Sequence, residues 1–110
     1  TTDKTMKTKI KLKEGYGQGF MPLGASYKNY TMLVAIANYS ENGVCYNDAM
    51  QMLDEDTSIE KYHSKIRLLE GLGGFMRAVC TEDFALAWNR ADGSNRDALL
   101  EALKNNEIEL

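Results

Sequence analysis

The spacing of apolar residues changes along the chain and separates one expected strand from several expected helices. Residues 8–13 read Thr-Lys-Ile-Lys-Leu-Lys, which places Ile10 and Leu12 on one side and lysines on the other. Such alternation is typical of a half-buried β-strand. Glycine then stands at every second position of residues 15–19, which predicts a turn-rich connector.

From residue 26 onward the apolar residues recur every three or four positions, as they do on one face of a helix. We expect Ser26 to cap a first helix that ends between residues 38 and 43. A single strand bridge is predicted at residues 44–45, and a second helix is expected to begin at Asn47. The inward positions of these two helices are Tyr30, Met32, Leu33, Val34, Ile36, Ala37, Ala49, Met50 and Leu53.

The third predicted helix covers residues 57–70 and begins at Thr57-Ser-Ile-Glu60, a capping box in which Thr57 and Glu60 bond each other's backbone N–H groups. Gly71 and the pair Gly73-Gly74 are expected to end this helix through a left-handed cap. A narrow apolar stripe is predicted to face the core. It consists of Ile59, Tyr62, Ile66 and Leu69.

Two runs rich in aromatic and β-type residues, 75–80 and 84–88, are separated by Thr81-Glu-Asp83, a suitable length for a β-hairpin. A short helix is then expected over residues 95–105. Its apolar face either packs on the first helix of the same chain or forms a two-fold homodimer. The last five residues are expected to fray.

Length and composition favour one small domain without a cofactor. The chain has 110 residues, 44% of them hydrophobic, and divides into a basic strand and connector at 1–25 and a domain at 26–110. Cys45 and Cys80 lack CxxC spacing, so we expect reduced thiols rather than zinc. The longest apolar run is far shorter than a membrane span, and no secretion signal is evident, which predicts a cytoplasmic protein.

Charge is distributed unevenly along the chain. The formal net charge is −3, whereas residues 1–14 hold five lysines against Asp3 and Glu14. A basic arm therefore precedes an acidic body. The lysines of the arm that could contact DNA are Lys9, Lys11 and Lys13, although a lysine-rich strand edge is also explained by solubility and edge protection.

The order helix, short strand, helix, turn, helix, hairpin over residues 30–88 resembles the winged helix-turn-helix family of DNA-binding regulators. The segments that carry the resemblance are "LVAIA…NGVCYNDAMQML" and "IRLLEGLGGFMRAV". The resemblance implies an α+β fold, with a three-helix core and a β-hairpin wing. The N-terminal strand and the short C-terminal helix would then be extensions of it.

In this family the third helix usually lies in the major groove, so the resemblance implies that helix 57–70 contacts double-stranded DNA. The polar residues opposite its apolar stripe can reach base edges or phosphates. They are Lys61, Ser64 and Arg67, with Lys65 on the flank. Acidic residues surround the start of this helix and occupy the hairpin tip, in departure from the family: Asp54, Glu55, Asp56, Glu82 and Asp83.

These features give two functional hypotheses. The first is a small DNA-binding transcription regulator, similar to those of phages and mobile elements. The second is a protein-interaction module that modulates a polymerase or another regulator, with Asp54, Glu55 and Asp56 as its contact surface. Neither is an enzyme, because His63 is the only histidine and no motif supplies a nucleophile with its base.

Overall fold

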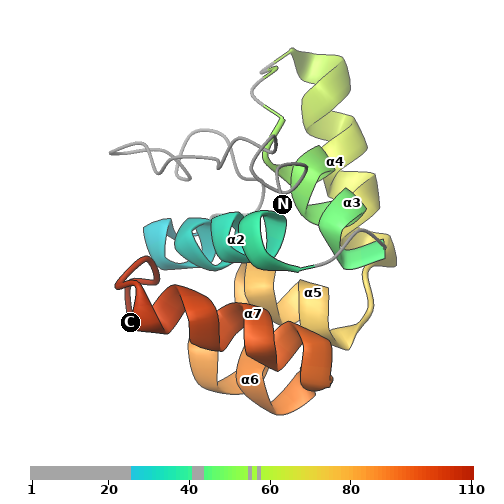
Figure 1. Ribbon diagram of the computed structural model, residues 1–110. Coiled ribbons are helices and arrows are strands. Elements are labelled where there is room, and N and C mark those ends of the chain that lie inside the picture. Colours follow the sequence, from blue (N-terminus) through green and yellow to red (C-terminus); the bar gives the residue numbers. More distant parts are fainter. Residues whose placement is uncertain (1–25, 41–43, 55, 57) are drawn as a thin grey trace, which may run out of the picture.

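Every regular element in the described part of the chain is a helix. The computed structural model describes residues 26–40, 44–54, 56 and 58–110, and Figure 1 shows their arrangement. The predicted strand at 8–13 and the connector at 15–19 lie outside this part. The helices are α2 (Tyr27–Tyr39), α3 (Val44–Met52), α4 (Ile59–Gly71), α5 (Gly74–Thr81), α6 (Phe84–Arg90) and α7 (Gly93–Lys104).

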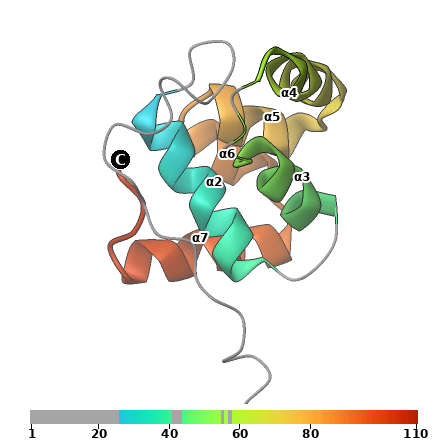
Figure 2. The same cartoon turned by 90° about the horizontal axis from the view of Figure 1, so that it is seen from above.

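The central helix is α2, which crosses the middle of the molecule between α7 on one side and α3 and α5 on the other (Figure 2). Ser26 caps it, as predicted from the sequence. The Ser26 hydroxyl accepts from the Asn29 N–H at 3.2 Å, and the Asn29 Oδ1 accepts from the Ser26 N–H at 3.0 Å. Both bonds satisfy polar groups at the start of the helix. The prediction of the first helix is therefore confirmed.

The predicted β-hairpin wing is wrong, and with it the α+β winged-helix fold class. Residues 75–80 lie in α5 and residues 84–88 in α6. The Asp83 side chain accepts from the Leu86 N–H at 3.0 Å, which caps a helix where we expected a hairpin tip. Phe75, Met76 and Val79 are buried together, a spacing of one, three and four residues that suits a helix better than a strand.

The starts of two helices also differ from the predictions. Residues 44–45 begin α3 rather than a strand bridge, so Asn47 lies within that helix and does not cap it. The cap of α4 is Ser58, whose side chain accepts from the Lys61 N–H at 3.2 Å. Thr57 lies outside the described residues. Thr57 and Ser58 are adjacent, and either hydroxyl could cap the helix, so the sequence alone does not show which of them does.

The predicted left-handed glycine cap between the third helix and the next element is wrong. Gly71 is the last residue of α4, and Gly74 is the first residue of α5. The capping residue of α4 is Leu72, in an extended conformation with φ of −70°. Leu72 is buried, so the chain turns there with an apolar side chain held in the core.

Helix α7 packs along α2, which is the intrachain alternative predicted for residues 95–105. The Asp92 side chain caps it by accepting from the Asn95 N–H at 2.9 Å. Its inward residues, Asn95, Ala98, Leu99 and Ala102, are buried. The apolar face of α7 is thereby covered within one chain and is not available to the predicted homodimer.

The residues after α7 are held in place, so the expected fraying of the last five residues is wrong. Asn106 takes a left-handed conformation with φ of 58°, and the Glu107 N–H donates to the Ala102 carbonyl at 2.8 Å. This geometry is that of a Schellman cap with asparagine in place of glycine. Ile108 is buried, and the Glu109 N–H donates to the Thr31 hydroxyl at 3.2 Å.

Candidate interaction surface

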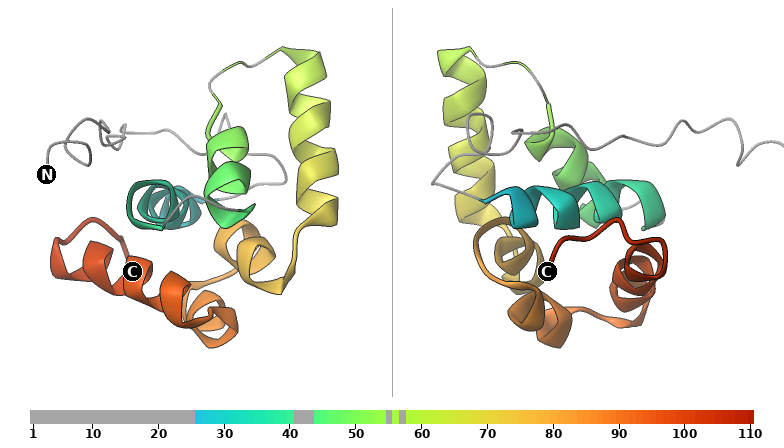
Figure 3. Two further views of the ribbon diagram at one scale, coloured as in Figure 1. Left: turned by 45° about the vertical axis from the view of Figure 1, so that its right-hand side comes forward. Right: turned by 90° about the vertical axis from the view of Figure 1, so that its left-hand side faces the viewer.

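Helix α4 stands at the edge of the molecule and is rotated about its axis from the predicted orientation. Figures 1 and 3 show it beside α3, clear of the other described helices on its far side. Ile59 is 73% exposed and Tyr62 44% exposed, although both were predicted to face the core. Lys65 is only 4% exposed, although it was predicted to face solvent. Leu69 was also predicted to face the core and is buried, so the helix is turned by only about a quarter of a revolution from the predicted orientation.

The inward face of α4 combines leucines with one lysine. Leu69 and Leu72 are buried, and Leu68 packs against the core from a half-buried position. Lys65 lies on the same face, one turn before Leu68 and Leu69. A lysine can occupy such a position because its methylene stem covers apolar surface while its ammonium group reaches a polar partner. Three leucines at spacings of one, three and four are the signal that sequence reasoning missed.

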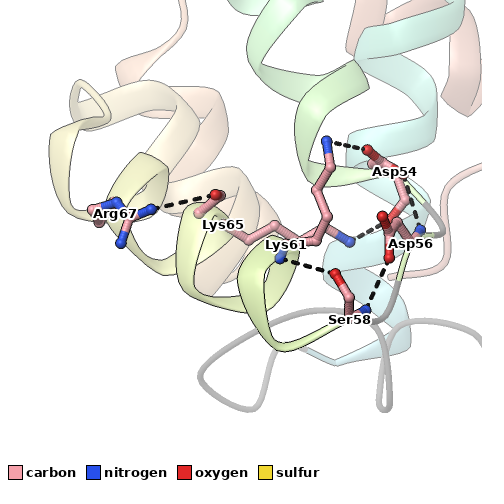
Figure 4. Close-up of polar contacts among 7 residues, drawn as sticks. Asp54, Asp56, Ser58, Lys61, Lys65 and Arg67 are labelled. Atoms are coloured by element: carbon pink, nitrogen blue, oxygen red, sulfur yellow. Dashed lines mark hydrogen bonds and ion pairs between the residues drawn. The ribbon is translucent and has the colours of Figure 1, made fainter.

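The ammonium group of Lys65 reaches the turn that precedes α4, as Figure 4 shows. It donates to the backbone carbonyl of Asp54. In the same cluster the Lys61 Nζ lies 2.8 Å from the Asp54 Oδ2, and the Asp56 N–H donates to the Asp54 Oδ1 at 2.9 Å. Two of the predicted DNA-binding cations, Lys61 and Lys65, therefore form one cluster with Asp54 and Asp56 of the predicted acidic contact surface, in which the opposite charges offset each other.

The electrostatics of this cluster follow from its contacts. The bond from Lys61, assisted by the Asp56 N–H, lowers the pKa of the Asp54 carboxyl, and the same ion pair raises the pKa of Lys61. Burial lowers the pKa of the Lys65 ammonium, because desolvation disfavours its charged form. The ion pair thus keeps Asp54 and Lys61 charged, whereas the charged form of Lys65 is destabilised by desolvation.

The predicted DNA-binding residues do not form one outward surface. Lys61, Ser64 and Lys65 share a hollow of about 50 Å³ with Gln51 and Leu68, on the side toward α3. Arg67 is exposed, with its Nη2 3.4 Å from the Ser64 Oγ. The remaining predicted site residues lie outside the described part of the chain. They are Lys9, Lys11, Lys13 and Glu55.

The outward side of α4 carries Ile59, Tyr62 and Ile66, which we call the α4 outer face. Ile66 is half-buried and does not belong to the main core. Their spacing of three and four residues aligns them along one side of the helix. The Tyr62 and His63 rings lie with their centroids 6.1 Å apart at a tilt of 53°. The α4 outer face therefore combines aliphatic and aromatic surface on a peripheral helix.

A larger hollow, of about 430 Å³, lies where the first turn of α2 meets the α5–α6 junction. Its volume is within the range of small-molecule sites. The hydroxyls that border it are engaged, because Ser26 donates to Asn29 and Thr81 donates to the Arg77 carbonyl. Its charged and apolar lining includes Lys28, Met32, Glu82, Asp83, Phe84, Glu109 and Leu110.

Comparisons with family models, curated proteins and solved structures found no match to this chain. Within the described residues, no group of three or more histidine, cysteine or acidic side chains is placed to hold a metal ion. In the same part of the chain, none of the helices has the length and apolar character needed to cross a membrane.

Proposed function

We propose that this chain is a protein-interaction module whose contact surface is the α4 outer face. The observation that carries this proposal is the exposure of Ile59 and Tyr62 on a helix that packs on the body by its other side. Exposed apolar residues at this spacing are typical of helices that dock against a partner. The acidic turn of the sequence-based hypothesis is replaced as the contact surface, because Asp54 is bonded to Lys61 within the chain.

Charge argues in the same direction. Residues 26–110 contain eight lysines and arginines and fourteen aspartates and glutamates, a formal charge of −6. Since neutralisation of phosphates supplies most of the non-specific affinity for DNA, an acidic body is poorly suited to lie on a duplex. Two of the cations expected on α4, Lys61 and Lys65, are engaged with Asp54. Burial of apolar surface is the interaction that α4 can still offer.

The test places a photo-crosslinking amino acid at position 62 of the full chain, in the cells that produce it. Position 100 is the matched control, because Leu100 is a similarly exposed apolar residue on α7. We expect crosslinked products from position 62 and few from position 100, and Ile59→Asp should remove those from position 62. Equal yields from the two positions, or none from position 62, would contradict the proposed function.

A second candidate is binding of double-stranded DNA through the N-terminal lysines, as in a small transcription regulator. The uneven charge supports it, because residues 1–14 carry a formal charge of +3 beside a body of −6. Basic arms of this kind add backbone contacts in several DNA-binding proteins. Among the predicted contact cations of α4, Arg67 is exposed and lies outside the Asp54 cluster.

This candidate is tested by titrating duplex DNA at several salt concentrations with the full chain and with Lys9→Gln, Lys11→Gln, Lys13→Gln combined. If the three lysines contact phosphates, the slope of log affinity against log salt should fall by about 3. Lys104→Gln, an exposed lysine at the end of α7, serves as the control and should leave the slope nearly unchanged. Absence of binding at low salt, or an unchanged slope in the triple variant, would reject DNA binding by the arm.

A further inference from the structure

We propose that the hollow of about 430 Å³ between the start of α2 and the α5–α6 junction binds a small organic cation, an amine carried on an apolar body. A hollow of this volume holds a small molecule rather than a folded partner. The residues that line it belong to α2, α5, α6, the α5–α6 junction, the position before α2 and the C-terminal segment, and none belongs to α4. The site is therefore separate from the α4 outer face.

The segments that form the hollow are held in place by hydrogen bonds within the chain. The C-terminal residues lie beside the start of α2 (Figure 1), where the Glu109 N–H donates to the Thr31 hydroxyl at 3.2 Å. On the α6 side, the Asp83 side chain accepts from the Leu86 N–H at 3.0 Å. The hollow is thus formed by ordered segments in the absence of a ligand, as most small-molecule sites are.

The charged side chains that line the hollow are mainly acidic. Glu82, Asp83 and Glu109 stand against one cation, Lys28. Arg90 offsets Glu82, because its Nη1 lies 3.3 Å from the Glu82 Oε2. Within the described residues, neither the Asp83 nor the Glu109 carboxylate forms an ion pair. A positively charged ligand is therefore favoured in the hollow, and an anion is repelled.

The uncharged part of the lining suits an apolar body. It includes Met32, Phe84, Ala85 and Leu110. The Phe84 ring stacks on the Trp88 ring, with the centroids 5.9 Å apart and the planes at 24°, and this contact restricts its movement. An aromatic ring attracts a cation over its face, and burial of apolar surface adds to the affinity. Carboxylates beside apolar and aromatic side chains thus select a ligand that is both positively charged and apolar.

The test is a titration of the isotope-labelled full chain at neutral pH, followed by the amide shifts in NMR spectra. The probes share one phenyl ring and differ in charge: phenethylamine is a cation, phenethyl alcohol is neutral and phenylpropanoate is an anion. We expect phenethylamine to give saturable shifts around the hollow with a Kd of about 1–10 mM, since a probe of this size offers little contact area. The alcohol should bind about 3-fold more weakly and the anion about 10-fold more weakly or not at all.

Charge variants of the lining should change the affinity in opposite directions. The double variant Asp83→Asn, Glu109→Gln should raise the Kd of phenethylamine about 10-fold, because two favourable charges are lost. Asparagine also caps helices, so α6 should keep its start. Lys28→Gln should lower the Kd about 2–5-fold, because it removes a like charge. Glu101→Gln, at an exposed position of α7, is the matched control and should leave the Kd within about 2-fold of the wild type.

The proposal is overturned if the three probes shift the same amides with equal affinity, or if the shifts neither saturate nor gather around the hollow. Unchanged affinity in both the double variant and Lys28→Gln would also overturn it, because the charges of the lining would then not select the ligand. These outcomes do not depend on crosslinks from position 62, so this proposal and the proposed interaction function fail independently.

Discussion

Asn29 ties the first turn of α2 to the end of α5, since its Nδ2 donates to the Val79 carbonyl at 2.9 Å. The same amide group donates to the Glu82 carbonyl at 2.7 Å. One buried side chain thus satisfies carbonyls at the end of one helix while its Oδ1 accepts at the start of another. This junction connects segments fifty residues apart in the sequence.

Asn29→Ala should lower the free energy of unfolding by about 2 kcal/mol, because it leaves buried polar groups without their partner. Urea denaturation followed by circular dichroism measures this loss. Asn89→Ala, at an exposed position of α6, is the matched control and should change stability by less than about 0.5 kcal/mol. Equal effects of the two variants would show that the bonds of Asn29 contribute little.

Lys65 should make stability depend on pH in the alkaline range. Its pKa is lowered in the folded state, so the unfolded chain binds the proton more tightly and the charged form opposes folding. That cost is fully present below the folded pKa and is relieved as the pH rises through it toward the ordinary value of 10.5.

Lys65→Met keeps much of the stem and removes the ammonium group, so it isolates this effect. We expect the stability of the variant relative to the wild type to fall as the pH rises from 7 to about 10. Urea denaturation at each pH gives this difference, and the same series with Lys104→Met accounts for an exposed lysine. A difference that stays constant with pH would mean that burial of Lys65 does not affect its titration.

The two thiols should differ in reactivity. Cys80 is buried, and burial raises the pKa of its thiol to about 12. Cys45 is only half-buried, and this partial burial is the main cause that raises the pKa of its thiol. At pH 8 we expect a disulfide reagent to modify Cys45 first, and Cys80 only as the chain unfolds, because the thiolate is the reactive form. The Cys45→Ser variant should then show almost no reaction without denaturant. Equal rates at both positions would contradict the packing of α5.

Substitution of two glycines distinguishes the structure from the glycine cap predicted from the sequence. Gly71 and Gly74 are helical, and a Cβ added at Gly71 meets nothing within 4 Å, while one at Gly74 lies 3.6 Å from the Arg90 Cδ, an ordinary contact. Alanine at either position should raise stability by about 0.4–1 kcal/mol by restricting the unfolded chain. A left-handed cap would instead make alanine cost about 1–2 kcal/mol. Thermal unfolding of each variant decides between them.

The elements predicted correctly are those with local signals in the sequence. The elements predicted wrongly are those whose type depends on packing against the rest of the chain. Ser26 and the helix after it were found because a cap and a broad apolar stripe coincide there. Asp83 was assigned to a hairpin tip because an acidic residue between two short apolar runs suits a turn and a helix cap equally well. Only burial of Phe75 and Val79 on one side of a helix separates the two.

The candidate site shows the same limit. Ile59 and Tyr62 were assigned to the core because apolar residues at helical spacing usually lie there. The competing stripe of Leu68, Leu69 and Leu72 prevailed because it meets the rest of the core, and Lys65 could join it once the Asp54 carbonyl accepted its ammonium group. When one helix carries two apolar stripes, its local sequence does not show which of them packs against the core.

The packing of α7 along α2 has a consequence for folding during synthesis. The helix at the centre of the core, residues 27–39, is completed by a helix that begins more than fifty residues later. Contacts between such distant segments form late, because the chain between them must first be ordered. Until residues 93–104 have left the ribosome, the side of α2 that packs on α7 lacks its cover, so the nascent chain exposes apolar surface there.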